Sequence, residues 1–187
     1  MANWAMTTYI IEGPQEDLQK IYDAIKNPSV QEGSSPEWEG NVLNTLGIEW
    51  DNKDYYMRGF IYEEPELDDI LTINAEEAYG LTDFRIPLKK HFPNIKVYWN
   101  TEEPGDDVFA TNDVEGKYFQ ERFYVNVWTK NADGIEYFEN KDSALKYVSN
   151  LTKGTINSVE DIDKFNEEND NSGQYITFCE CAVIKED

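Results

Sequence analysis

Histidine, cysteine and basic residues are all scarce in this sequence. Its 187 residues include one histidine and two cysteines, and 38 acidic residues stand against only 16 basic ones, which gives a net charge of −22. A single histidine excludes any metal site that needs two or more histidine ligands. The negative charge is also unfavourable for nucleic-acid binding, because Lys and Arg must neutralise the phosphates. We therefore expect no direct nucleic-acid partner.

Long apolar runs are missing as well. No stretch approaches the roughly 20 apolar residues of a transmembrane helix. The first residues, MANWAMTTYIIEG, contain no Lys or Arg and no extended apolar segment, so we expect no signal peptide. The acidic charge would also be repelled by anionic membrane surfaces. These features predict a cytoplasmic protein without a membrane partner.

The few reactive side chains do not form a recognisable catalytic set. Cys179 and Cys181 lie two residues apart in a strand-like run, where side chains are roughly 7 Å apart and poorly placed for a disulfide. A pair of His91 with one of them is conceivable, but we expect the cysteine-bearing strand to be buried, and buried cysteines are normally inert. His91 fits a structural position near a helix C-terminus. We expect no cofactor, no catalytic residues and no enzymatic activity.

What is present favours a folded domain. Hydrophobic residues make up 40% of the chain and aromatic residues 14%, which is too apolar for a disordered acidic tail. The length suits one good core or two small ones. Because no flexible linker and no internal repeat is visible, we predict a single compact unit over residues 1–187.

Periodic patterns in the first half predict the order of the elements. Apolar residues recur at helical spacing between Leu18 and Ile25, which predicts an amphipathic helix over 14–26. The expected elements are a strand (6–12), this helix, a loop (28–40) with a short helix after it, two strands (55–63 and 69–78), a helix ending in LKKHF (88–92), and a strand (95–102). Apart from the short helix, this is the ferredoxin-like order βαββαβ on a mostly antiparallel sheet.

The second half predicts an extension of the same sheet. Strands are expected at 108–111 and 118–128, a helix from Asn140, a second helix with a capping-box start at Ser158 and Asp161, and a closing strand at 174–185. The closing strand is apolar on both faces, which predicts a central or well covered position. The overall prediction is an α+β fold with a ferredoxin-like core (1–115) and a strand-helix-helix-strand extension (116–187) packed on one sheet.

Short motifs spread over residues 1–115 point to a known family. They are MANW…YIIEGPQEDLQKIYDAI, LTINAEEAYG, PLKKHFPNIKVYWNTEEPG and VFATND. Together they resemble the YubB-like proteins of plasmids, phages and gut bacteria, a resemblance that implies a ferredoxin-like domain. It implies no catalytic residues, because the family has no established activity. The chain departs from the family at Ala5, where relatives often have Cys, and at Ala78-Tyr79-Gly80, where they often have Trp.

Four carboxylates surround a Pro-Gly pair in NTEEPGDD (100–107). Pro-Gly suits the centre of a type II turn, with Gly at positive φ, and this turn is the favoured interpretation. A weak divalent-cation site using Glu102, Glu103, Asp106 and Asp107 is an alternative, although no EF-hand pattern is present. A catalytic carboxylate pair is a third, but adjacent Glu102 and Glu103 point to opposite faces of a strand.

Trp38 is the aromatic residue that we expect to contact a partner. The other aromatics lie in strand-like runs, where they fill space between a sheet and its helices. Trp38 lies instead in the loop SSPEWEG, where an exposed indole is a better indication of a partner-binding surface.

Two classes of function follow from these observations. The first is a non-enzymatic module from a mobile element that binds the basic surface of another protein, in its sharpest form by mimicking the charge of DNA. The second is a domain that binds a small molecule or a divalent cation through the carboxylates near residues 102–107, with or without catalysis. Neither class identifies the partner or the oligomeric state.

Overall fold

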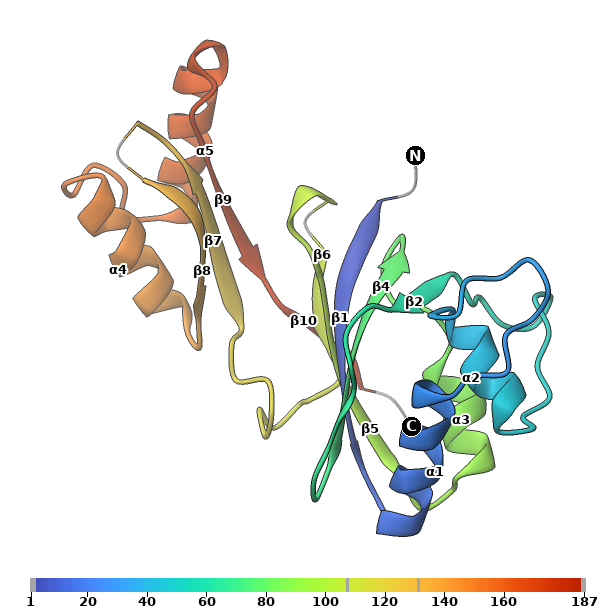
Figure 1. The fold of residues 1–187 in the computed structure, drawn as a ribbon. Coiled ribbons are helices and arrows are strands. Elements are labelled where there is room, and N and C mark those ends of the chain that lie inside the picture. Colours follow the sequence, from blue (N-terminus) through green and yellow to red (C-terminus); the bar gives the residue numbers. More distant parts are fainter. Residues whose placement is uncertain (1–2, 107, 131, 186–187) are drawn as a thin grey trace. The chain divides into compact units, whose positions relative to one another are not determined.

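The chain divides into two compact units. The computed structural model describes residues 3–106, 108–130 and 132–185 (Figure 1). The N-terminal unit runs as far as Asp113, and the C-terminal unit spans Val114–Ile184. Both units combine helices with mostly antiparallel strands, so the predicted α+β class is confirmed. Among the described residues, no helix has the length and apolar character needed to cross a bilayer.

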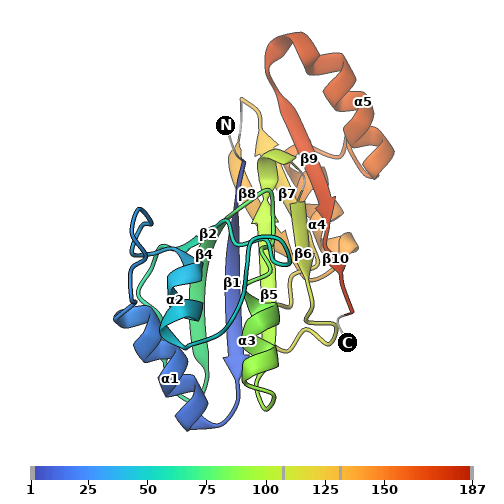
Figure 2. The same cartoon turned by 90° about the vertical axis from the view of Figure 1, so that its right-hand side faces the viewer.

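The N-terminal unit is one sheet with helices on one side of it (Figures 1 and 2). Its strands pair in the order β6-β5-β1-β4-β2, with β3 also beside β4, and each of these pairs is antiparallel. The elements are β1 (Trp4–Glu12), α1 (Gln15–Lys26), α2 (Glu39–Thr45), β2 (Gly59–Ile61), β3 (Glu66–Leu67), β4 (Leu71–Ala78), α3 (Arg85–His91), β5 (Lys96–Glu103), a 3-10 turn η1 (Pro104–Asp106) and β6 (Val108–Thr111).

Alternation along the central strands decides which face is buried. In β1 the odd-numbered residues from Ala5 to Ile11 are buried, whereas Trp4 and Met6 are exposed. In α1 the helical spacing buries Leu18 and Ile21, as predicted, together with Ala24, and Tyr22 and Ile25 are partly buried against the same core. These two periodicities bring one face of the sheet and one stripe of the helix into a shared core, which also contains Leu43, Leu71, Ile73, Phe84, Leu88 and Trp99.

The C-terminal unit is a second, smaller sheet with its own core. Its strands pair in the order β8-β7-β9. Phe123, Val125 and Val127 on β7 pack in one cluster with helix residues that include Val148 and Ile162. The elements are β7 (Phe123–Trp128), β8 (Asp133–Phe138), α4 (Lys141–Leu151), α5 (Val159–Asn169), a 3-10 turn η2 (Asp170–Ser172), β9 (Tyr175–Glu180) and β10 (Ala182–Val183).

Strands β7, β8 and β9 correct the prediction that the whole of residues 116–187 extends the first sheet. They form a separate sheet with a hydrophobic cluster of its own. The sequence also gave no sign of β8, because none of its six positions is buried and it lacks an alternating apolar pattern. Without β8, one of the two partners of β7 could not be recognised from the sequence.

Several predicted strands are shorter in the structure. Residues 55–63 yield only β2, because the backbone N–H of Tyr56 donates to the Asp83 carboxylate (2.8 Å) instead of a neighbouring strand. The predicted strand 118–128 begins at Phe123. The closing strand 174–185 is split between β9 and β10 at Cys181. Because β9 lies at one end of the order β8-β7-β9 and is only partly buried, the prediction of a central, covered strand is wrong.

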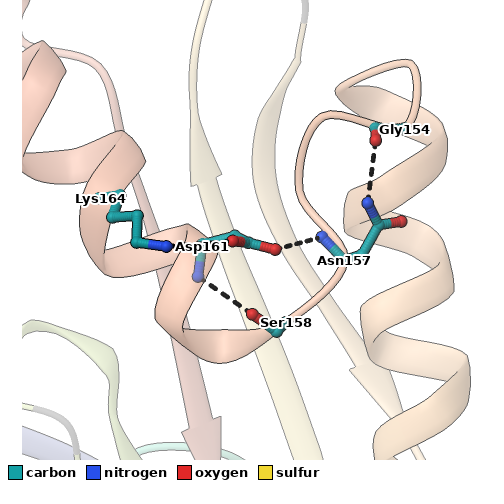
Figure 3. A network of polar contacts seen from close by, with 5 residues as sticks. All are labelled: Gly154, Asn157, Ser158, Asp161 and Lys164. Atoms are coloured by element: carbon teal, nitrogen blue, oxygen red, sulfur yellow. Dashed lines mark hydrogen bonds and ion pairs between the residues drawn. The ribbon is translucent and has the colours of Figure 1, made fainter.

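The predicted starts of both C-terminal helices are confirmed. Asn140 caps α4, its Oδ1 accepting a hydrogen bond from the Ser143 N–H (3.0 Å). At α5, the Ser158 hydroxyl accepts from the Asp161 N–H (3.2 Å), and the Asp161 carboxylate accepts from the Asn157 N–H (3.2 Å) (Figure 3). The N–H of Asn157 and then the Ser158 hydroxyl lower the pKa of Asp161. This reciprocal pattern is close to that of a capping box.

We expect Ser158→Ala to lower the free energy of unfolding by about 0.5–2 kcal/mol, because the Asp161 N–H loses its acceptor. Urea unfolding followed by far-UV circular dichroism measures the change. Ser143→Ala, an exposed position in the first turn of α4, is the control and should stay within about 0.5 kcal/mol of the parent. Equal losses for the two variants would contradict the capping role.

Candidate functional site

A pair of carboxyl groups is buried in the core of the N-terminal unit. The first belongs to Glu77 on β4, where Leu71, Ile73 and Ala75 precede it at every second position on the buried face. Because side chains alternate along a strand, Glu77 follows them inward. The alternation in LTINAEEA already indicates an inward position for Glu77, which is missing from the candidate residues predicted above.

The second carboxyl group belongs to Glu39 in the first turn of α2. Val42 and Leu43 lie three and four residues further on and are buried, so helical spacing places Glu39 on the same inward face. Space for its carboxylate is provided at Gly59 of β2, where an added Cβ would lie 2.3 Å from Oε2 of Glu39. Glycine at position 59 therefore permits the close approach of α2 to the sheet.

Two hydroxyl groups bind this pair. The Tyr9 hydroxyl on β1 donates to Oε1 of Glu77 (2.6 Å). The Thr82 hydroxyl, just before α3, lies 2.6 Å from the same oxygen and 2.8 Å from Oε2 of Glu39. All four side chains are at most 1% exposed. We call Tyr9, Glu39, Glu77 and Thr82 the carboxyl cluster.

Hydrogen-bond counting shows that the described donors are too few for the carboxyl oxygens of the cluster. Thr82 has one hydroxyl proton and cannot donate to both carboxyl groups. Oε1 of Glu39 and Oε2 of Glu77 have no donor among the described residues. Two carboxylates this close in a dry interior do not both ionise. One of the two groups is therefore neutral.

The pKa of Glu39 is raised, which favours its protonated form. Burial raises its pKa well above the ordinary 4.5, and the charge of Glu77 and a hydrogen bond with Glu77 raise it further. Burial is also the main cause of the raised pKa of Tyr9, followed by the charge of Glu77. A positive charge is near as well: Arg85 lowers the Tyr9 pKa, and its Nη1 donates to the Thr82 carbonyl (2.7 Å).

The arrangement can store a proton, but its burial keeps it from solvent. A general acid or base must reach the reacting atom of a substrate, and none of the four side chains reaches the surface. Its direct effect is therefore on stability. The unfolded chain ionises Glu39 above its ordinary pKa, whereas the folded chain holds the proton, so stability falls as the pH rises towards the raised pKa.

We expect Glu39→Gln to remove this loss of stability at high pH. The parent should lose about 1.4 kcal/mol for each pH unit within the window that begins near the ordinary carboxyl pKa. The variant has no proton to lose there, and its amide can donate to Glu77, so its stability relative to the parent should rise with pH. Urea unfolding at several values between pH 5 and 8 measures both slopes.

Glu76→Gln is the matched control, because Glu76 neighbours Glu77 on β4 but belongs to the opposite, outer face. Its stability should follow the pH dependence of the parent. Parallel curves for Glu39→Gln and the parent would show that the carboxyl cluster does not hold a proton in the folded state.

The residues of NTEEPGDD lie where β5 passes into β6. Glu102 and Glu103 end β5, opposite Phe109 and Val108 of β6. The connection is the 3-10 turn η1, and Gly105 does not have a positive φ. The predicted type II turn is therefore wrong, because that turn requires positive φ at the glycine.

Only part of the predicted carboxylate group comes together. Glu103 and Asp106 interact: partial burial, then the charge and hydrogen bond of Asp106, raise the Glu103 pKa. Asp106 also accepts a hydrogen bond from the Asn3 amide. Asp107 lies outside the described residues. Within the described part of the chain, no group of three or more His, Cys, Asp or Glu side chains is placed to hold a metal ion.

Trp38 is half-buried and has a structural role. It directly precedes α2, and its indole N–H donates to the Met57 carbonyl (2.7 Å). Its ring packs edge-on against Trp50, with ring centroids 5.4 Å apart. These contacts differ from the freely exposed indole that the loop sequence led us to expect. A contact of Trp38 with a partner stays a prediction.

The remaining reactive residues are also in structural positions. His91 ends α3, as predicted, and its ring packs against Phe92. Cys179 and Cys181 are not joined in a disulfide; Cys181 is buried and Cys179 is partly exposed. Burial raises the pKa of Cys181 to about 11, so this thiol is not ionised at neutral pH and is a poor nucleophile.

Comparison of the chain with protein-family models, with curated proteins and with solved structures found no match in any of the three. The resemblance to YubB-like proteins therefore stays a prediction from short motifs. No functional role is transferred to any residue from a relative.

Proposed function

We propose that this protein is a non-enzymatic binding module whose N-terminal unit binds the basic surface of another protein. The supporting observation is the unequal distribution of charge. Residues 1–113 with 185–187 contain 25 acidic and nine basic residues, a net charge of −16, whereas residues 114–184 contain 13 and seven, a net charge of −6. A field of one sign steers oppositely charged partners and speeds their association.

Exposed carboxylates gather on the connection between β2 and β4. Glu63, Glu64, Glu66, Asp68 and Asp69 are all exposed. Lys26 pairs with Glu64, but among the described residues no cation pairs with Glu66, Asp68 or Asp69. An acidic surface with few internal counter-charges is the kind that attracts lysine- and arginine-rich segments.

A ferredoxin-like architecture and an origin in a mobile element belong to this proposal. With the short elements α2 and β3 set aside, the succession β1-α1-β2-β4-α3-β5 supports the ferredoxin-like assignment. The motifs that resemble YubB-like proteins support the origin. In its sharpest form the module would compete with DNA in the cytoplasm. Acidic residues on α1 and α5, such as Glu16, Asp17, Glu160 and Glu167, could imitate part of the phosphate charge.

We expect the isolated protein to bind a fluorescein-labelled lysine-rich peptide, with an affinity that falls several-fold between 50 and 300 mM NaCl. The physical reason is screening, since the Debye length shortens as the ionic strength rises. Fluorescence anisotropy measures the dissociation constant at each salt concentration, and a peptide with glutamine in place of every lysine is the control. Binding that is independent of salt, or equal for both peptides, would contradict the proposal.

A second candidate function is the binding of a divalent cation by Glu103 and Asp106. The observation in its favour is that the two carboxyl groups interact: after partial burial, the charge and hydrogen bond of Asp106 raise the pKa of Glu103. A cation would relieve their repulsion. This alternative includes a small-molecule site at the same place.

For this alternative, Ca²⁺, Mg²⁺ or Mn²⁺ should raise the melting temperature, because a ligand that binds only the folded state stabilises it. Differential scanning fluorimetry of the parent and of Glu103→Gln measures the effect, and the shift should be lost in the variant. A flat response to all three metals would exclude the cation site.

A further inference from the structure

A groove of about 290 Å³ opens on the N-terminal unit beside the C-terminal end of α1. One wall comes from α1 and the residues after it, and another from β2 and the acidic connection that follows it. Its volume lies at the lower end of the range for small-molecule sites. It therefore suits one long side chain better than a large ligand.

The floor of this groove is apolar. Ile25 comes from α1, Val42 from α2 and Ile61 from β2, and Pro28, Pro36 and Pro65 complete it. Val42 and Ile61 belong to the hydrophobic core, so the floor is the outer surface of a packed interior. The Ile61 N–H donates to the Glu37 carbonyl (2.9 Å), which fixes the preceding loop against β2.

The rim of the groove is negative. Three exposed carboxylates, Glu37, Glu63 and Glu64, line it. Glu37 accepts from the Ser35 hydroxyl and from its own backbone N–H, Glu63 accepts from the Asn74 amide (2.8 Å), and Glu64 accepts from Lys26. A carboxylate offers about four acceptor sites, so each retains acceptor capacity.

The carboxylate charges near the rim contribute to a raised pKa of a neighbouring side chain. Tyr62 also lines the groove. Its pKa is raised first by partial burial and then by the charges of Glu63, Glu76 and Glu102. The groove therefore lies in a region of negative potential, which favours a cation over a neutral or anionic occupant.

Lys26 gives an internal example of such a cation. It ends α1, lines the groove and forms an ion pair with Glu64. This contact shows that the ammonium group of a lysine at this rim is within ion-pair distance of a carboxylate. It also neutralises part of the negative charge that an incoming cation would meet.

We propose that this groove binds one lysine or arginine side chain of a partner protein, with the methylene groups over the apolar floor and the cationic head at Glu37 and Glu63. The inference rests on the proposed function and adds to it the place and the mode of binding. Long cationic side chains combine an apolar stem with a charged head, and the groove offers a surface for each part.

The test uses the intact protein and two labelled peptides of equal length and charge. One is fluorescein-labelled (Gly-Lys)₄, and the other carries 2,4-diaminobutyrate, which is two methylenes shorter, in place of each lysine. At pH 6.5 both side chains are cationic. Because each methylene removed from water favours binding, we expect the short-chain peptide to bind several-fold more weakly, as measured by fluorescence anisotropy.

Matched variants test the rim. Glu37→Gln with Glu63→Gln should weaken the binding of (Gly-Lys)₄ by about tenfold, more than the control pair Glu66→Gln with Asp69→Asn, which removes the same charge outside the groove. Lys26→Gln should strengthen binding by releasing Glu64. Lys20→Gln, on the same helix and paired with Glu16 (2.8 Å), is its control and should strengthen binding less.

The outcomes separate this inference from the proposed function. Salt-dependent binding that is equal for both peptides, and unchanged by the groove variants relative to their controls, would overturn the groove while leaving a basic partner in place. No binding of either peptide at low salt would overturn both. Binding that depends on stem length and on Glu37 and Glu63 would support both.

Discussion

The arrangement of the N-terminal unit depends on burying two carboxyl groups against each other without leaving two charges in the core. Glu77 comes from β4, Glu39 from α2, Tyr9 from β1 and Thr82 from the segment before α3, so a single hydrogen-bonded cluster joins four parts of the chain. Removing charge from water is costly, and neutralising one carboxyl group with a proton lowers that cost. The packing of α2 on the sheet therefore depends on one of the two carboxyl groups being protonated.

The same helix also determines the surface that we propose for binding. Glu39 begins α2, and Glu37, two residues earlier, lies at the groove rim, where its carbonyl accepts the Ile61 N–H. Gly59, which leaves room for the Glu39 carboxylate, is two residues before Ile61 on β2. Carboxylates therefore have two roles within a short distance along the chain. One pair is buried and holds a proton, and the others are exposed and create a negative potential.

Much of the fold followed from local patterns, and the exceptions have clear causes. Helix α1, the start of α4 near Asn140 and strands β1, β4 and β5 lie close to where the sequence predicts them. Strand β8 was missed because an exposed edge strand needs no apolar alternation. The turn at Gly105 was assigned the wrong type because Pro-Gly permits positive φ at glycine and does not require it. For the candidate site, the periodicity of β4 and α2 predicts that Glu77 and Glu39 each lie on a buried face. That the two carboxyl groups lie next to each other is visible only in the folded structure.

The sequence by itself determined the excess of acidic residues, the shortage of histidine and cysteine, and the faces of the main helices and strands, because these depend on composition and on neighbours along the chain. Only the tertiary structure decided which residues meet. Tyr9 and Glu77 are 68 positions apart in the sequence and are hydrogen-bonded to each other. The floor and the rim of the groove are formed by residues from separate segments of the chain. It also decided that residues 123–180 form a sheet of their own. Periodicity fixes the direction of a side chain but not its distant partner, which depends on packing over the whole unit.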